Sequence, residues 1–334
     1  MVNSQSQLLD KLRKAVFHRQ SLLQQGEPFR LFHREFDGQA GLWIDCFGQA
    51  LIVHVEEQFD FLHSQLRAIK GEIRDLTGVE HIYVRIHRRR RQEVKADEVF
   101  LLTEAAGPNE EFIINEKGLR YVVRPRSQVN GGFFIDARDL RQLVRLHAMN
   151  ARVLNTFAFT GSIGLSAAIG GALEVTQVDI SRGILRWARE NQKLNDGLCL
   201  RSQMKFIEED SRTFLAREER RIQQGKIPYD IVVLDPPTFG SSGKKPFRLV
   251  SEYQDLLSSG LRVLGEGGHL FFTCNCTRIA VDDLKRAAQE AAMRLNWQID
   301  IFNPIYPPRI DFGSFQKGHP SLRGIHLAVS KNKT

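Results

Sequence analysis

The chain has 334 residues, which is enough for two domains that each bury a core. Its 47 lysines and arginines outnumber its 39 acidic residues, and the net charge of +8 favours a polyanionic partner or an acidic surface. Four cysteines argue against a disulfide framework, and we find no secretory signal, transit peptide or apolar run of membrane length. These features exclude secreted disulfide-rich and membrane-spanning classes, and we expect a cytoplasmic protein.

The first part of the chain predicts a helix followed by a small mixed domain. Residues 5–25 carry leucines at helical spacing among polar side chains. From residue 29 onward, short apolar runs alternate with turns, and one helix is expected at 61–76. A glycine pair near residue 131 marks the join to the second domain. The expected organisation is an N-terminal helix (1–28), a small α+β domain that is a candidate for RNA binding (29–126) and a second domain (127–334).

The densest positive charge is the run His87-Arg88-Arg89-Arg90-Arg91. Such a run can contact nucleic-acid phosphates, in which case binding falls steeply with salt. A solvated loop is the alternative, and the sequence leaves both open. Arg124 and Arg126 are further candidates for phosphate contact, and Lys244 and Lys245 belong to a glycine-bearing stretch that we expect to act as a lid over a target base.

The stretch Val153–Gly164 is an apolar strand that runs into a glycine turn and then a helix. A second short strand at 175–178 ends at Asp179, which is placed to accept hydrogen bonds from both hydroxyls of a ribose. A dinucleotide site would require G-x-G-x-x-G, and the turn Phe159–Gly164 lacks the first glycine. A ligand with a ribose but no phosphate fits better, and S-adenosylmethionine is the common one. An ordinary strand-turn-helix with a chance acid is the alternative.

A third strand is expected at 204–207, and Asp210 follows it. This acid is placed to hydrogen-bond an adenine amino group beside the ribose. It is equally suited to cap the helix that begins at Ser211, and the two roles are compatible.

The apolar run Tyr229–Leu234 predicts a central parallel strand, followed by Asp235, Pro236, Pro237, Thr238 and Phe239. The two prolines lock φ and remove two N–H donors, which leaves carbonyls directed into the crevice at the strand ends. Such a corner can hold a planar base, with Phe239 stacked on it. Asp235 is then placed to accept a proton or a hydrogen bond near a transferred methyl group. A simple tight turn is the alternative.

A further strand within 267–277 carries Cys274 and Cys276 at its carboxyl end. The spacing is too short for a zinc site and other cysteines are too few, so we expect no metal. A thiolate can add to C6 of cytosine, after which C5 takes a methyl group and a base removes the C5 proton so that the sulfur leaves. The alternative is that both cysteines are small apolar core side chains. A helix at 281–295 and a last strand at 324–330 complete the domain.

Four blocks of sequence, taken in order, resemble the bacterial 23S ribosomal RNA methyltransferases of the RlmI/RlmK type. They are 37–45, similar to the pattern D-G-x-x-G-L-x-x-D, and 132–139, 155–161 and 235–239. The resemblance implies an α/β fold: a Rossmann-like class I methyltransferase with a seven-stranded, mostly parallel sheet, preceded by a small α+β domain. It also implies S-adenosylmethionine as the cofactor. The implied partner is RNA, either 23S rRNA or a large-subunit precursor. No membrane contact is expected, and a homodimer is left open.

By this resemblance, residues 155–161 hold the methionine part of the cofactor, Asp179 the ribose and Asp210 the adenine. A segment at 134–138 matches the part of the family that lies over the cofactor pocket; its alternative is a helix start with Asp136 as cap and Arg138 on a solvated face. The expected cofactor-binding residues are Phe134, Asp136, Arg138, Asn155, Thr156, Phe157, Ala158, Thr160, Gly161, Asp179, Ile180, Asp210 and Asp235. The expected substrate-binding residues are Pro236, Pro237, Phe239, Lys244, Lys245, Arg88, Arg89 and Arg90, and the expected catalytic residues are Cys276 and Asp235.

Family members that methylate cytosine C5 carry T-C-S-C-S or a near variant, and Cys276 sits on their nucleophile. Here Asn275 replaces a serine of that pattern. Residues 274–278 also partly resemble the polar S-N-N-K-R-like run of the guanine-N7 branch. The D-P-P-T-F sequence at 235–239 is likewise closer to the guanine-N7 branch. We therefore expect methylation of a 23S rRNA base at cytosine C5 through a Cys276 thiolate adduct, with guanine-N7 methylation and no adduct as the alternative.

Two alternatives come from other classes. An NAD-dependent oxidoreductase would need the dinucleotide fingerprint that the glycine turn lacks. A non-catalytic RNA-binding protein would tolerate loss of the three acids at the strand ends. Many relatives begin with a PUA RNA-binding module, which we do not expect before residue 29, so the small domain is expected to contribute more to RNA recognition.

Overall fold

The computed structural model describes residues 2–59, 61–88, 97–102, 111–127, 129–198, 202–240, 246–313 and 321–332. Residue contacts divide the chain into two compact units. The first comprises Met1–Ile135 and Pro308–Gly318, and the second comprises Asp136–Pro307 and His319–Thr334. The domain limits expected from the sequence remain a prediction.

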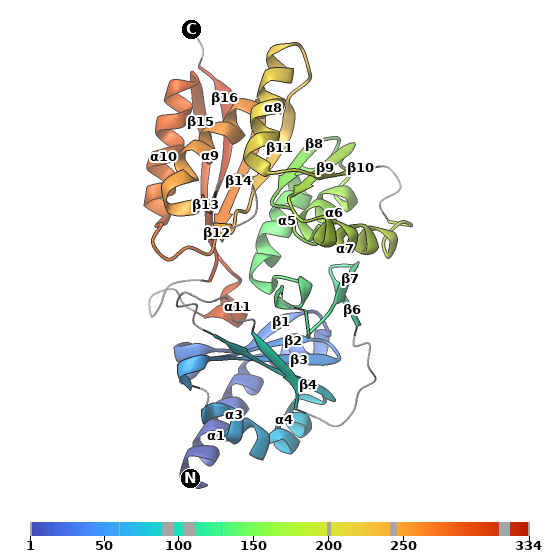
Figure 1. Ribbon diagram of the computed structural model, residues 1–334, viewed down its shortest axis with the longest axis vertical. Coiled ribbons are helices and arrows are strands. Elements are labelled where there is room, and N and C mark those ends of the chain that lie inside the picture. The colour runs from blue at the N-terminus through green and yellow to red at the C-terminus, as the bar shows by residue number, and fades with distance from the viewer. Residues whose placement is uncertain are drawn as a thin grey trace. The chain divides into compact units, whose positions relative to one another are not determined.

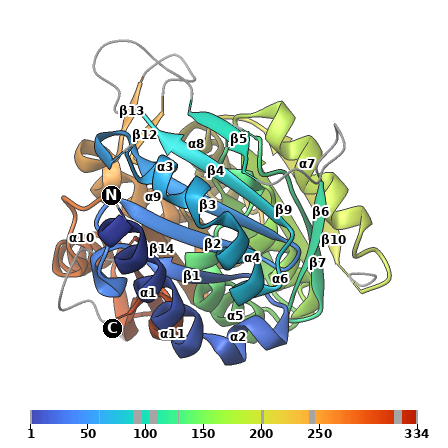
Figure 2. The same ribbon diagram turned by 90° about the horizontal axis from the view of Figure 1, so that it is seen from below.

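The first unit contains a five-stranded sheet in the order β1-β2-β3-β4-β5, in which only the β3–β4 pair is parallel. Helices α1, α3 and α4 lie over one face of it (Figure 2). The elements are α1 (Val2–His18), α2 (Gln20–Gln25), β1 (Phe29–His33), β2 (Leu42–Phe47), β3 (Ala50–Glu56), α3 (Phe61–Ala68), α4 (Lys70–Thr77), β4 (His81–His87), β5 (Glu98–Leu101), the hairpin β6 (Phe112–Glu116) and β7 (Leu119–Val123), and α11 (Arg309–Phe312).

The two faces of this sheet differ because side chains alternate along each strand. Ile44, Val53 and Val84 are fully buried in the apolar core beneath the helices. On the other face, the register places His54 opposite both Trp43 and Arg85. The unit therefore has one apolar face, which packs, and one polar and aromatic face.

Two helices expected to be continuous are each broken. The helix predicted at 5–25 ends at His18 and resumes at Gln20, because the buried Arg19 between them leaves the helical conformation, with φ −115° and ψ 18°. Its guanidinium binds both carboxylate oxygens of Asp37 at 3.0 and 2.9 Å and donates to the carbonyl of Asp311. The helix predicted at 61–76 is likewise two helices, with the break at Ile69, whose φ of −108° and ψ of 19° are not helical.

The second unit contains the predicted seven-stranded sheet, in the order β10-β9-β8-β11-β14-β16-β15. The first five strands are parallel, and β16 pairs antiparallel with both β14 and β15. The strands are β8 (Arg152–Thr156), β9 (Glu174–Asp179), β10 (Gln203–Glu208), β11 (Tyr229–Leu234), β14 (Leu264–Cys274), β15 (Trp297–Ile305) and β16 (Arg323–Lys331), with a short pair β12 (Phe239–Gly240) and β13 (Phe247–Arg248). The predicted α/β, Rossmann-like fold is confirmed.

Helices cover both faces of this sheet (Figure 1). On one face lie α5 (Arg138–His147), α6 (Ser162–Ile169) and α7 (Arg182–Lys193), and on the other α8 (Ser211–Gln223), α9 (Leu249–Val263) and α10 (Val281–Arg294). The core beneath α8 to α10 takes alternate residues of the central strands, such as Leu234 and Phe272. Among the described residues, no helix has the length and apolar character that a bilayer span requires.

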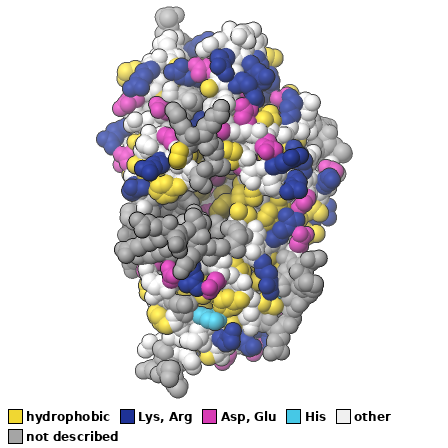
Figure 3. Space-filling view, in the orientation of Figure 1, with side chains coloured by type: hydrophobic (Ala, Val, Ile, Leu, Met, Phe, Trp, Pro, Cys, Tyr) yellow, Lys and Arg dark blue, Asp and Glu magenta, His cyan; other side chains and the backbone are white. Residues whose placement is uncertain are grey.

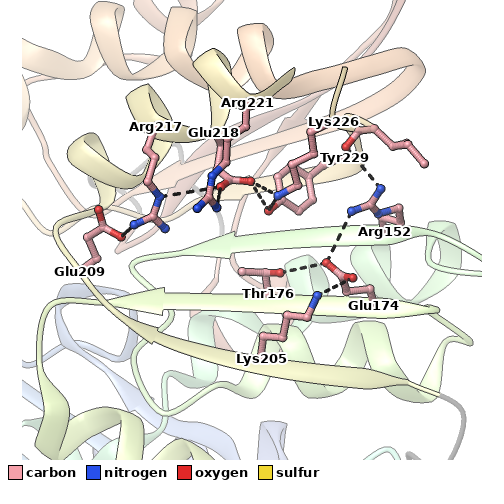
Figure 4. A network of polar contacts seen from close by, with 11 residues as sticks. Arg152, Glu174, Thr176, Lys205, Glu209, Arg217, Glu218, Arg221, Lys226 and Tyr229 are labelled. Carbon is pink, nitrogen blue, oxygen red and sulfur yellow. Dashed lines mark hydrogen bonds and ion pairs between the residues drawn. The ribbon is translucent and has the colours of Figure 1, made fainter. Parts of the chain in front are cut away.

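A buried polar network fixes α8 to the sheet (Figure 4). The Glu218 side chain is 1% exposed, accepts hydrogen bonds from Arg221 at 2.9 Å and from the Tyr229 hydroxyl at 3.0 Å, and pairs with Lys226. Burial acts to raise the pKa of Glu218, but these partners outweigh it and lower the pKa below its ordinary value. Glu218 is therefore a paired structural carboxylate.

Candidate functional site

Apart from Asp136 and Arg138, which lie just before and at the start of α5, the predicted site residues of the second unit lie at the ends of neighbouring parallel strands. Residues 157–161 follow β8, Asp179 ends β9, residues 235–239 follow β11, and Cys276 follows β14. Because β9, β8, β11 and β14 are adjacent and parallel, these segments meet at one edge of the sheet. The fold thus gathers the predicted residues where α/β proteins bind ligands.

The turn after β8 has an unusual backbone. Phe157 and Phe159 have positive φ values of 55° and 51°, and Gly161 has φ 82°. The left-handed region is costly for large side chains and persists only where surrounding contacts impose it. Here Ala158 N donates to the Val178 carbonyl at 2.9 Å, and Phe157 N donates to Ser211 Oγ at 3.2 Å. The turn is held in a strained shape of the kind found at ligand sites.

Close packing beneath this turn explains its glycines. A Cβ on Gly164 would lie 2.5 Å from Cδ of Gln177, and one on Gly161 would lie 3.0 Å from the same side chain. Gln177 is fully buried and accepts a hydrogen bond from Asn155 Nδ2 at 3.3 Å. The expected cofactor residues Asn155, Thr156 and Thr160 are therefore fully buried, and Ala158 is 5% exposed.

Asp179 is oriented by the backbone on both sides. Phe159 N donates to its Oδ2 at 3.0 Å and Ser181 N donates to its Oδ1 at 2.9 Å. Burial raises the pKa of Asp179, and the backbone donors act against that rise. The backbone N–H of Ile180 also hydrogen-bonds this carboxylate, so the three donors leave room for a hydrogen bond from a ribose hydroxyl. Beside it, Ile180 is 37% exposed and offers an apolar surface.

Asp210 is the N-cap of α8. Its Oδ1 accepts from the backbone N–H of Arg212 at 2.9 Å and of Thr213 at 3.2 Å, and the Arg212 guanidinium binds Oδ2 at 2.8 Å. Burial acts to raise the pKa of Asp210, but these donors lower it overall. The capping role is confirmed, and the contact to adenine stays a prediction.

Asp235 is the acid with the most altered proton affinity at this edge. Burial raises its pKa to about 6, against the hydrogen bond that Thr273 Oγ1 donates to Oδ1 at 2.7 Å. The charge of Asp136 raises the pKa further, and the charge of Arg141 lowers it. Thr273 and the fully buried Arg141 were not predicted as site residues. The only sequence signal for Thr273 is its place at the end of the strand that carries the cysteines.

The segment after Asp235 is tied to the segment after β14. Thr238 Oγ1 donates to Asn275 Oδ1 at 2.6 Å. Pro236 is buried, Pro237 is exposed, and Phe239 is 62% exposed and available for stacking. The predicted substrate residues Lys244 and Lys245 lie outside the described residues.

Both cysteines at the end of β14 are buried. Cys274 is 1% exposed and Cys276 is 3% exposed, and both belong to the apolar cluster with Ile279 and Leu284. Burial raises the pKa of Cys274 to about 11, so that side chain stays a thiol at neutral pH. Cys274 is therefore core, whereas a role for Cys276 as nucleophile stays a prediction.

The segment before α5 is not the capped, solvated helix start that was the alternative to a cofactor-binding segment. Ala137, not Asp136, is the N-cap of α5, and Arg138 is buried at 9% exposure rather than solvated. The alternative of a capped helix with a solvated face is therefore wrong for both residues. Asp136 lies in a 3₁₀ turn, Ile135–Ala137, close enough to raise the pKa of Asp235. Phe134 is 37% exposed and belongs to the first unit.

Two arginines considered for phosphate contact, Arg88 of the basic run and Arg124, are paired with acids. Arg88 binds Glu57 at 3.1 Å and Glu98 at 2.7 Å, and Arg124 binds Glu111 at 2.6 Å. Arg89, Arg90 and Arg91 lie outside the described residues. On the face shown in Figure 3, the drawn Lys and Arg side chains are scattered among acidic ones. Phosphate contact by Arg88 stays a prediction.

Comparison with known proteins gives relatives of both sequence and fold. Ribosomal RNA large subunit methyltransferase I of Aeromonas salmonicida is 32% identical over 271 residues, which cover 79% of this chain and 65% of that protein. Ribosomal RNA large subunit methyltransferase K/L of Colwellia psychrerythraea is 32% identical over 171 residues, or 51% of this chain and 23% of that protein. This chain thus spans just under two thirds of the length of the Aeromonas protein.

The fold has a close counterpart among solved structures. A candidate S-adenosylmethionine-dependent methyltransferase from Streptococcus mutans superimposes with a TM-score of 0.81 at 21% identity, covering 97% of this chain and 81% of that one. Residues 65–318 match the family described as S-adenosylmethionine-dependent methyltransferase. The predicted family and its cofactor are confirmed: the chain belongs to the S-adenosylmethionine-dependent methyltransferase family.

Proposed function

We propose that this chain uses S-adenosylmethionine to methylate a base of large-subunit ribosomal RNA. The observation that carries the proposal is Asp235, whose pKa is raised to about 6 at the sheet edge that also bears the strained turn after β8 and Asp179. A carboxyl group that exchanges its proton near neutral pH suits reaction at a nucleobase. The names of the relatives from Aeromonas and Colwellia support ribosomal RNA as the substrate.

The residues present fit the cofactor. The turn at 157–161 brings backbone groups to the strand end, where the methionine part would lie. Asp179 keeps acceptor capacity for a ribose hydroxyl beside its backbone donors, and the Ile180 side chain provides an apolar contact for adenine. Asp210 has both oxygens engaged, so an adenine amino group would share them with the N-cap bonds. When bound, the cofactor supplies an electrophilic methyl group.

Cytosine C5 is the first target that we propose. Sγ of Cys276 forms a bond with C6 of the ring, which makes C5 electron-rich, and C5 then takes the methyl group. Asp235 accepts the C5 proton, the electron pair of that C–H bond restores the double bond, and the C6–S bond breaks to release the thiolate. Thr273 holds the Asp235 carboxylate in place during this proton transfer.

Guanine N7 is the second candidate, and the burial of Cys276 in the apolar cluster favours it. N7 attacks a methyl group with its own lone pair, so the reaction needs neither a thiolate nor removal of a proton. Asp235 would then stabilise the positive charge that develops on the purine. The polar contact between Thr238 and Asn275 places hydrogen-bonding groups, rather than a thiolate, on the exposed side of this loop.

Nucleoside mass spectrometry after incubation with isotopically labelled S-adenosylmethionine and large-subunit ribosomal RNA tests both proposals. Label in 5-methylcytidine that is lost with Cys276→Ala and kept with the matched core control Cys274→Ala supports the thiolate adduct. Label in 7-methylguanosine that survives Cys276→Ala supports the second candidate. If RNA stays unlabelled while S-adenosylmethionine binds, ribosomal RNA is not the substrate.

A further inference from the structure

Three histidines from separate parts of the second unit meet away from the strand-end site. His147 is the last residue of α5, His269 lies within β14, and His326 lies within β16. The antiparallel register sets His326 opposite Phe271, and alternation along β14 puts Phe271 and His269 on the same face of the sheet. The fold, rather than local sequence, brings the three rings together.

The rings are close enough to share one small ligand. One nitrogen from each histidine can be chosen so that all three atoms lie within 4.8 Å of one another. Ring centroids of His147 and His269 are 4.1 Å apart, and each lies 5.1 Å from that of His326. Nδ1 of His269 and Nε2 of His326 already share one hydrogen bond of 2.9 Å.

One ring of this cluster carries a buried nitrogen that makes no hydrogen bond within the described part of the chain. His326 is 2% exposed and stacks on Phe271 with a centroid distance of 4.4 Å and an interplanar angle of 4°. Its Nδ1 is buried and has no hydrogen-bond partner among the described residues. A buried nitrogen without a partner is unfavourable, and it signals either a ligand or a special role.

We propose that His147, His269 and His326 bind one divalent transition-metal ion of the zinc class. Three imidazoles and no carboxylate are a ligand set that suits zinc, nickel or copper rather than magnesium or calcium. A tetrahedral zinc ion at about 2.0–2.1 Å from each nitrogen requires nitrogen separations of about 3.3 Å, so modest ring rotations complete the site. Because His147 and His269 are partly exposed, water can enter and take the fourth position.

The position of His147 within α5 also favours a cation at this cluster. His147 is at the carboxyl end of a ten-residue helix, where the helix dipole is negative. His269 precedes Thr273 by four residues, or about 13 Å along the strand, so the ion lies outside reach of Asp235. The ion therefore acts as a structural link between α5, β14 and β16 and takes no part in methyl transfer.

Cobalt(II) chloride titration of the full chain, prepared without a polyhistidine tag, tests this site. We expect one Co²⁺ per chain with the strong visible absorption of tetrahedral cobalt, displaced by added zinc chloride. At a hundredfold excess of zinc over its dissociation constant, the thermal unfolding midpoint should rise by about 5 °C.

His147→Gln is the test variant, because a partly exposed residue at a helix end can be replaced without disturbing the core. It should weaken binding at least tenfold, as should His269→Gln, whereas His18→Gln, an exposed histidine of α1 in the other unit, should bind as the wild type does. The proposal is overturned if wild type shows no tetrahedral cobalt spectrum, or if both cluster variants bind as tightly as wild type.

Discussion

Asp235 and Thr273 lie side by side at the carboxyl ends of β11 and β14, where the threonine hydroxyl donates a 2.7 Å hydrogen bond to the carboxylate. The parallel register that pairs Leu234 with Phe272 puts the two following residues at the same level. Thr273 thereby orients an acid whose burial raises its pKa to about 6. This pair joins the fold to the chemistry that we propose.

Asp235→Asn should make the protein more stable at pH 8 and less active. The folded pKa of Asp235, about 6, lies above its ordinary value of 3.8, so the favourable contribution of this group is present below pH 3.8 and lost as pH rises through 6. Removing the charge should therefore stabilise the protein by about 3 kcal/mol at pH 8 and by about 0.5 kcal/mol at pH 4.

Chemical denaturation at the two pH values measures this difference. If cytosine C5 is the target, as we propose first, methyl transfer should also fall by about a hundredfold or more because the acceptor of the proton is lost. An asparagine variant that is less stable than wild type at pH 8 would show that the carboxylate is well paired in the fold and would contradict the raised pKa.

Gly164→Ala should destabilise the second unit by about 1–3 kcal/mol, because the new Cβ would overlap the buried Gln177 side chain. Gly183→Ala is the matched control: this glycine is also helical, in α7, but the nearest atom to a new Cβ is 4.0 Å away. The control should gain about 0.5–1 kcal/mol from helix propensity. Equal effects of the two substitutions on the thermal midpoint would show that the contact with Gln177 is unimportant.

The second unit was predictable because its central strands are short segments that contain several apolar or β-branched residues. The run Tyr229–Leu234 matches β11 at both ends, and the helix expected at 281–295 is α10 with one residue fewer. These patterns depend on neighbouring residues alone, so the strands and helices can be predicted from a single sequence.

The features that the sequence did not predict depend on contacts between residues that are far apart in the chain. Thr273 and Arg141 reach Asp235 from another strand and from a helix, and no spacing in the sequence links them. His269 and His326 are 57 positions apart and meet only through the β14–β16 register. The break at Arg19 has the same origin, because its buried partner Asp37 lies beyond the helix.

Asp45→Asn should destabilise the first unit by about 3 kcal/mol at pH 7, because it leaves the buried Arg30 without its charged partner. Burial alone would raise the pKa of Asp45, but Arg30 and His54 lower it to about 2. The stabilisation is therefore present above the ordinary pKa of 3.8 and lost as pH falls toward 2.

Urea denaturation between pH 2.5 and 7 follows that loss. Asp75→Asn, at a side chain that is 77% exposed, is the control and should change stability by less than about 0.5 kcal/mol throughout. A constant difference between wild type and Asp45→Asn across this range would rule out the proposed charge pairing.

Calorimetric titration of S-adenosylmethionine into the wild type and Asp179→Ala tests the assignment of the strand-end site most directly. We expect one site per chain in the wild type and at least tenfold weaker binding, about 1.4 kcal/mol, in Asp179→Ala, because the ribose loses its acceptor. The control Asp196→Ala, at an exposed acid after α7, should bind as the wild type does. Unchanged affinity in Asp179→Ala would show that Asp179 does not bind the ribose and that the cofactor lies elsewhere.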